Sequence, residues 1–127
     1  LNVKFKHLDD YINKRREIAE KYNQSFENLP LILPPKLSEK KYHDTYASYV
    51  IRTQERDKLF DYLREDGIEV FVHIPKPLYK YKGLGLEQTV LLKNELICSQ
   101  NVSIPIYPEM EERQIKEVID TIKKFYK

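Results

Sequence analysis

The sequence contains no tryptophan, a single cysteine, three glycines and no long apolar run. Because Cys98 is the only cysteine, an intramolecular disulfide and a cysteine-rich zinc site are both excluded. Cys98 follows Leu96 and Ile97, and in this apolar stretch we expect a small buried side chain rather than a reactive thiol. A lone cysteine of this kind favours a cytoplasmic protein.

The composition also argues against membrane-spanning and nucleic-acid-binding proteins. No stretch approaches the ~18 consecutive apolar residues of a transmembrane helix, and no basic-then-apolar signal opens the chain. The 22 basic and 20 acidic residues are interleaved, without the basic face that is typical of nucleic-acid binders. With 127 residues, of which 41% are hydrophobic, the chain has the size and composition of one soluble domain. We therefore expect neither a membrane nor a nucleic acid as a partner.

The first 27 residues predict a long amphipathic helix. No Ser, Thr, Asp or Asn cap precedes its apolar stripe, which leads us to expect that the helix continues a segment lying upstream of Leu1. The rest of the chain can cover only part of the stripe, so we expect its first part to contact that segment or a second subunit. The stripe consists of Leu1, Phe5, Leu8, Ile12, Ala19, Tyr22 and Phe26.

The middle of the chain predicts two strands and a helix. After an extended stretch at 29–35 and a polar loop at 36–41, β-branched and aromatic residues predict a strand at 45–52. Thr53 is then expected to cap a helix that ends at Gly67. Alternating apolar residues predict the next strand at 68–74, with one buried face.

The last third predicts a loop at 75–86, a weak helix at 90–99, a short strand at 102–107 and a final helix. Glutamates begin the final helix and lysines end it, which suits the helix dipole. The whole order predicts an α/β (α+β-like) fold: a three- to four-stranded, mostly antiparallel sheet with helices on one face. We expect residues 1–28 to form the long helix and residues 29–127 to form this small domain.

His73 is the first candidate for a functional residue. Local enzyme signatures are missing: there is no phosphate-binding glycine loop, no two-histidine metal helix and no Gly-x-Ser-x-Gly elbow. His73 ends a predicted strand on the face opposite the buried one. Its imidazole can donate to a phosphate or a sugar hydroxyl, or transfer a proton near pH 7. The alternative is a structural histidine that covers the sheet, and both interpretations remain open.

The loop that follows His73 carries three lysines and two tyrosines between residues 76 and 82. Ammonium groups can bind a diphosphate, and tyrosines can stack on a base or hydrogen-bond to a sugar. The alternative is a charged surface loop without a ligand. The candidate substrate-binding residues are therefore His73, Lys76, Tyr79 and Lys80, and the sequence offers no catalytic set and no metal-ligand set of its own.

Five stretches of the chain occur in an order and a spacing that are similar to those of a known family. They are Lys14-Arg15-Arg16 with Ala19 and Tyr22, Arg56-Asp57, Gly67-Ile68, His73-Ile74-Pro75 with Pro77-Leu78-Tyr79, and Ser103-Ile104-Pro105-Ile106-Tyr107-Pro108. Together they span nearly the whole chain. They resemble the C-terminal segment of the DegT/DnrJ/StrS sugar aminotransferases.

The resemblance implies a fold-type-I enzyme that uses pyridoxal 5'-phosphate to aminate a nucleotide-linked keto sugar, with a donor such as glutamate. It places such an enzyme in cell-surface polysaccharide or deoxysugar biosynthesis. It also implies that the lysine of the Schiff base lies in a large domain before Leu1, to which residues 1–28 would link. Since no lysine here matches it, we expect the cofactor to be bound by residues outside this chain and the fragment alone to be inactive.

The resemblance further implies that His73 and Tyr79 lie at the mouth of the sugar site. Two positions depart from the commoner pattern: Ile74 stands where an aromatic residue is frequent, and Tyr79 where histidine is frequent. Ser103 and Tyr107 are implied to be structural. We also expect a cytoplasmic homodimer. The alternative class is a free-standing small α/β binding or interaction module without catalytic activity.

Overall fold

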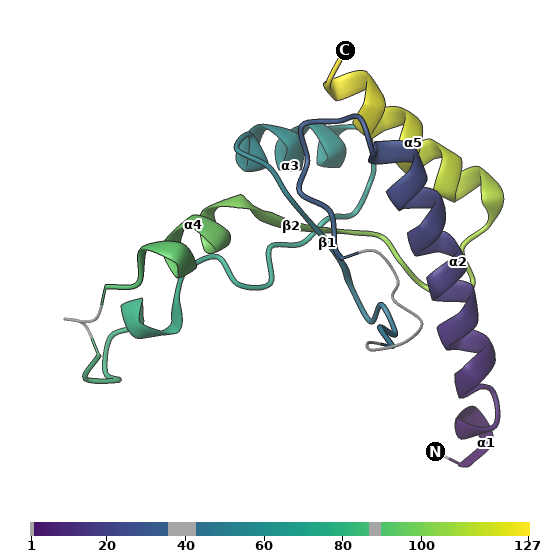
Figure 1. Ribbon diagram of the computed structural model, residues 1–127, viewed down its shortest axis with the longest axis horizontal. Helices are drawn as coiled ribbons and strands as arrows, with labels where there is room; N and C mark the ends of the chain where they lie inside the picture. Colours follow the sequence, from purple (N-terminus) through teal and green to yellow (C-terminus); the bar gives the residue numbers. More distant parts are fainter. Residues whose placement is uncertain (1, 36–42, 87–89) are drawn as a thin grey trace.

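The computed structural model describes residues 2–35, 43–86 and 90–127 (Figure 1). Leu1 and the polar loop expected at 36–41 lie outside the described residues. In chain order the elements are α1 (Asn2–Phe5), α2 (Leu8–Phe26), β1 (Tyr49–Arg52), α3 (Arg56–Glu65), the short 3₁₀ helix η1 (Leu78–Lys80), α4 (Leu92–Gln100), β2 (Asn101–Ile104) and α5 (Glu112–Phe125).

The long first helix is present but interrupted after its first turn. A turn in which the His7 N–H donates to the Lys4 carbonyl separates α1 from α2. The second half of α2 buries Ile18, Ala19, Tyr22 and Phe26, and it packs against α5. The first part is open, because Phe5 is 71% exposed and α1 extends away from the rest of the fold in Figure 1. The apolar stripe is therefore covered only in its second half.

The sheet is antiparallel. β1 pairs with β2 in a register that sets Tyr49 opposite Ile104 and Ile51 opposite Val102. Single bridges add one extended segment on each side, Ile32 to Arg52 and Phe71 to Ser103. The expected α/β class with an antiparallel sheet is confirmed, but the sheet has two full strands with two singly bridged neighbours.

The supply of backbone donors explains why the segment around Phe71 pairs only once. Extending the ladder from the Phe71–Ser103 pair would next pair residue 69 with Pro105 and residue 73 with Asn101. Pro105 has no N–H to give. The Asn101 N–H already donates to the Ile97 carbonyl at the end of α4. The segment at 68–74 therefore lies beside β2 without forming a strand.

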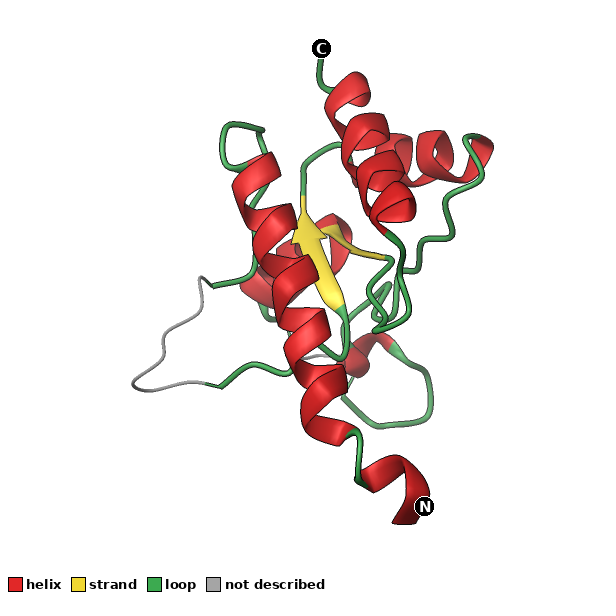
Figure 2. Ribbon diagram, turned by 90° about the vertical axis from the view of Figure 1, so that its right-hand side faces the viewer, coloured by secondary structure: helices red, strands yellow, loops and turns green. Residues whose placement is uncertain are grey.

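The two faces of the sheet differ in what covers them. Tyr49, Ile51, Val102 and Ile104 share one face, and they join α2, α3 and α5 in the hydrophobic core. In Figure 2 the two strands lie beside the long helix that leads from the N-terminus. The expectation that helices pack on one face is thus confirmed. Alternate residues, including Ser103 and Phe71, point to the other face.

Local backbone features set where two elements begin. Tyr46 has a positive φ of 46°, and its N–H donates to the Asp44 carboxylate at 2.8 Å, so β1 begins only at Tyr49. Thr53 does not cap α3 directly; its hydroxyl accepts the Glu55 N–H, and the helix begins at Arg56.

Among the described residues, no helix combines the length and the apolar character needed to cross a membrane.

A buried hydrogen bond joins α2 to β1 and provides a test of the core. The Tyr49 hydroxyl donates to the Asn23 side-chain oxygen at 2.7 Å, and both residues are buried. Burial, with smaller contributions from neighbouring tyrosines, raises the pKa of Tyr49, so the phenol stays protonated. We predict that Tyr49→Phe lowers the free energy of unfolding by ~1–3 kcal/mol, measured in urea, because Asn23 loses this partner.

Tyr81→Phe is the matched control, because Tyr81 is exposed. It is expected to change the free energy of unfolding by less than ~0.5 kcal/mol. Equal effects of the two substitutions would show that the hydrogen bond between α2 and β1 does not stabilise the core.

Candidate functional site

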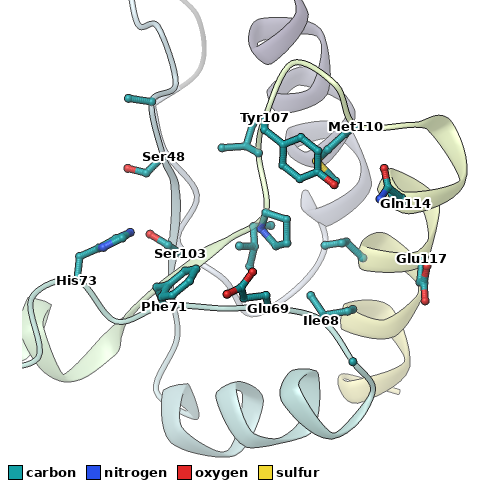
Figure 3. Close-up of a pocket in the computed structure, with 16 residues that line it drawn as sticks. Ser48, Ile68, Glu69, Phe71, His73, Ser103, Tyr107, Met110, Gln114 and Glu117 are labelled. Carbon is teal, nitrogen blue, oxygen red and sulfur yellow. The ribbon is translucent and has the colours of Figure 1, made fainter.

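A cavity of about 470 Å³ opens between residues 67–73, the segment that follows β2 and the N-terminal half of α5 (Figure 3). Apolar residues, such as Ile68 and Ile104, also line it. The polar and aromatic side chains that line it are Ser48, Glu69, Phe71, His73, Ser103, Tyr107, Gln114 and Glu117.

The sheet register explains why several of these side chains meet. Ser103 lies opposite both Val50 in β1 and Phe71 in the bridged segment. Since side chains alternate along extended backbone, Ser48 and His73 lie on the same face as Ser103, away from the helices. Figure 3 shows the three at one end of the cavity. There the rings of Phe71 and His73 stack on each other, with centroids 5.8 Å apart and an interplanar angle of 18°.

Ser103 lines the cavity, although sequence analysis did not propose it as functional and the resemblance implied that it is structural. Its backbone N–H and carbonyl pair with Phe71 at 2.8 and 3.1 Å. Its side chain is buried, with 5% of the residue exposed, yet its hydroxyl has no hydrogen-bond partner within the described part of the chain. A single serine in a short strand carries no sequence signal for a site. Only its pairing with Phe71, which places it on the same face as His73, indicates one.

The charges around the cavity are acidic. Glu69 and Glu117 line it, whereas none of its lining residues is a lysine or an arginine in the described ranges. Pyridoxal phosphate needs an amine for its imine bond and donors for its phosphate. The cavity offers neither an ammonium nor a guanidinium group, so these residues do not fit that cofactor. They suit a neutral ligand that is rich in hydroxyl groups.

The other candidates lie on a separate unit, which we call the arm: residues 75–86 together with α4. It extends to one side of the fold in Figure 1. The Tyr79 hydroxyl donates to Glu95 at 2.9 Å and accepts the Leu91 N–H at 3.1 Å. The Lys80 ammonium pairs with the second Glu95 oxygen at 2.8 Å. Tyr79 and Lys80 thus tie the loop to α4.

Lys76 lies near the start of the arm. Its ammonium stands 4.3 Å from the centre of the Tyr81 ring, which is a cation–π contact. Asn101 fixes the junction, because its side-chain amide donates to the Ile74 carbonyl at 3.1 Å and to the Ile97 carbonyl at 3.0 Å. The structure therefore places His73 in the cavity lining and ties Tyr79 and Lys80 to α4, and Lys76 lies between these residues in the chain.

Two further expectations concern cysteine and metals. Cys98 is free and buried, as its apolar surroundings predicted. In the parts of the chain that the structure describes, no three His, Cys, Asp or Glu side chains gather in a way that could hold a metal ion.

The contacts of Glu95 generate a prediction on pH. Hydrogen bonds from Lys80 and then from Tyr79 lower the pKa of Glu95, and the bond to Glu95 raises the pKa of Lys80. A lowered carboxyl pKa means that the stabilisation is present at neutral pH and is lost as the pH falls through that pKa. We predict that amide exchange at residues 78–82, normalised to intrinsic rates, is protected at neutral pH and loses protection in acid.

Glu95→Gln removes the titrating group, so it is expected to lower the neutral-pH protection and to abolish the acid transition. Glu109→Gln, at an exposed position before α5, should change neither the protection at neutral pH nor the acid transition. An acid transition that survives in Glu95→Gln would assign it to another group.

Comparisons with known proteins agree with the fold. The profile of the DegT/DnrJ/EryC1/StrS aminotransferase family matches residues 1–123. The pleiotropic regulatory protein of Geobacillus stearothermophilus is 34% identical over 100% of this chain and 35% of its own length. The dTDP-3-amino-3,6-dideoxy-alpha-D-galactopyranose transaminase of Aneurinibacillus thermoaerophilus is 32% identical over 98% of this chain and 34% of its own length.

A solved structure shows the same arrangement of elements. The crystal structure of S. venezuelae DesV in complex with a ketimine intermediate superposes with a TM-score of 0.90 at 26% identity, over 99% of this chain and 34% of that one. The chain thus spans about a third of the length of these relatives. The family is dependent on pyridoxal phosphate. Because the family profile covers nearly every residue, this chain belongs to the DegT/DnrJ/EryC1/StrS aminotransferase family.

Proposed function

We propose that this chain is the C-terminal part of a pyridoxal-phosphate-dependent aminotransferase that aminates a nucleotide-linked keto sugar, and that it contributes part of the nucleotide-sugar site. Family membership supports the reaction class. The transaminase from Aneurinibacillus thermoaerophilus, named for a dTDP-linked amino sugar, supports the substrate class. The share of the relatives that the chain spans supports a contribution to a longer protein.

The observation that carries this proposal is that the chain has two kinds of polar surface. One end of the cavity is lined by Ser48, His73 and Ser103, and the arm that follows in the chain carries lysines. A nucleotide sugar also has two parts, a neutral ring and a charged diphosphate with its base. We assign His73, at the cavity, to a hydroxyl of the sugar. We assign Lys76 to the diphosphate, because an ammonium group in a cation–π contact keeps its charge and its donors.

Tyr79 and Lys80 take a combined role in this proposal. Their contacts with Glu95 hold the arm in shape. Lys80 can share its ammonium donors between Glu95 and a phosphate oxygen, because an ammonium group has three N–H donors. Tyr79 is 6% exposed and orients the loop from within. It thus supports the lysines on either side of it.

The cofactor belongs to the rest of the protein in this proposal. Pyridoxal phosphate would be held by residues outside this chain, since the cavity lining does not fit it. Residues 1–28 would link to that large domain, and residues 29–127 would form the small domain. The exposed Phe5 and Leu8 side chains support a surface that the complete protein covers. We further propose glutamate as an amino donor and a cytoplasmic homodimer as the assembly.

The substrate assignment is tested in the full-length protein that carries this chain. His73→Ala and Lys76→Ala are each expected to raise KM for the nucleotide sugar by about tenfold, because each removes a charged or polar contact worth ~1.4 kcal/mol. KM for the amino donor should stay the same. The matched control is Lys124→Ala, at an exposed position on α5. If both test variants keep the parent KM, the assignment of these two residues is wrong.

The isolated chain tests where the chemistry lies. We predict that it shows no transaminase activity and leaves the absorbance spectrum of added pyridoxal phosphate unchanged. A stable Schiff-base band that disappears on mutating one lysine of this chain would contradict the proposal. An isolated chain that light scattering shows to be a well-behaved monomer, with its first helix covered, would instead favour the free-standing binding module.

A further inference from the structure

The Ser103 hydroxyl is the starting point for a more specific assignment of the cavity. The residue is 5% exposed, and the hydroxyl has no hydrogen-bond partner among the residues that the structure describes. A buried hydroxyl without a partner has lost its hydrogen bonds to water without forming new ones, so it lowers the free energy of unfolding. Alanine would fit the same backbone without this cost. The hydroxyl therefore needs a partner that arrives from outside the described chain.

The groups around Ser103 indicate what that partner is. The Ser48 and His73 side chains lie at the same end of the cavity (Figure 3). The Phe71 ring forms the adjacent wall, and it is 51% exposed although it lies on a bridged segment of the sheet. Ligand pockets combine an apolar or aromatic wall with a few placed polar groups. A sugar ring matches this wall, because its C–H face packs on an aromatic ring while its hydroxyls point sideways to donors and acceptors.

The charge of the cavity separates a sugar ring from a diphosphate. Glu69 and Glu117 line the cavity, and no lysine or arginine side chain lines it in the described ranges. Two carboxylates raise the energy of a phosphate group placed between them. The same carboxylates accept hydrogen bonds from sugar hydroxyls. The lysines stand on the arm, whose described residues do not line the cavity.

We propose that this cavity is the sugar-ring subsite, in which the Ser103 hydroxyl hydrogen-bonds to a ring hydroxyl and the Phe71 ring packs on the face of the sugar, while the diphosphate stays outside it. The assignment rests on the proposed nucleotide-sugar site and adds Ser103 and Phe71 to it. Ser103 is thereby a specificity-determining residue, and its hydroxyl favours ligand binding at a cost to stability.

The test uses the full-length protein with two separate probes, methyl α-D-galactopyranoside for the ring and thymidine diphosphate for the charged part. Dissociation constants come from ligand-detected NMR titrations, and Tm from thermal unfolding. Ser103→Ala is expected to weaken glycoside binding by about three- to tenfold, the effect of one hydrogen bond, and to leave thymidine diphosphate binding unchanged. Its Tm is expected to equal or exceed that of the parent, since the substitution removes an unpaired buried hydroxyl.

The control is Ser99→Ala, because Ser99 is an exposed serine on α4 whose hydroxyl already donates to the Leu96 carbonyl. It should change the dissociation constant of neither probe. Phe71→Leu is a second variant, at an exposed ring, and it is expected to weaken binding of the glycoside and to leave binding of thymidine diphosphate unchanged.

Three results would overturn the subsite. One is a lower Tm for Ser103→Ala with unchanged glycoside binding, which would make the serine structural. Another is weaker binding of thymidine diphosphate instead of the glycoside. The third is a parent protein that binds thymidine diphosphate but not the glycoside, which would leave the nucleotide-sugar proposal standing. A parent protein that binds neither probe would overturn both.

Discussion

The alternation of side chains across the antiparallel pair β1 and β2 is the constraint on which the rest of this structure depends. It sends Tyr49, Ile51, Val102 and Ile104 into one face, where they form the core with α2, α3 and α5. The same alternation leaves Ser103 on the other face, where it lines the cavity. The register thus brings Ser103 into the cavity lining, while Ile104 belongs both to the core and to the cavity wall. A shift by one residue would bury the serine among the helices and expose the core residues.

The edge of this sheet creates the space that the cavity occupies. Pro105 and the engaged Asn101 N–H limit pairing with the neighbouring segment to Phe71. Beyond that bridge, the segment is free to diverge from β2, and the cavity opens between them and α5. Asn101 also ties Ile74 to the end of α4, which fixes where the arm leaves the sheet. A full third strand at this edge would close the gap between the two segments.

Sequence patterns predicted what depends on neighbours in the chain. The final helix, with its acidic start and apolar stripe, is present as α5, and its Glu111–Gln114 capping box forms. The face of His73 also followed from alternation. Patterns could not predict contacts between distant segments, such as Tyr79 with Glu95 or Ser103 with Phe71, because each depends on how two elements meet. The early break at His7 was missed, since the apolar spacing continues through it.

These features together separate recognition from chemistry within the proposed enzyme. The cavity lining has hydroxyls, an imidazole, aromatic rings and carboxylates, while its described residues include no amine that could react with a carbonyl. Such a lining can position a ligand and choose between rings that differ in one hydroxyl, because an unmatched buried hydroxyl is costly. It cannot carry an amino group. Substitutions in this chain should therefore change which sugar is accepted, whereas the transfer step would depend on the part of the protein that holds the cofactor.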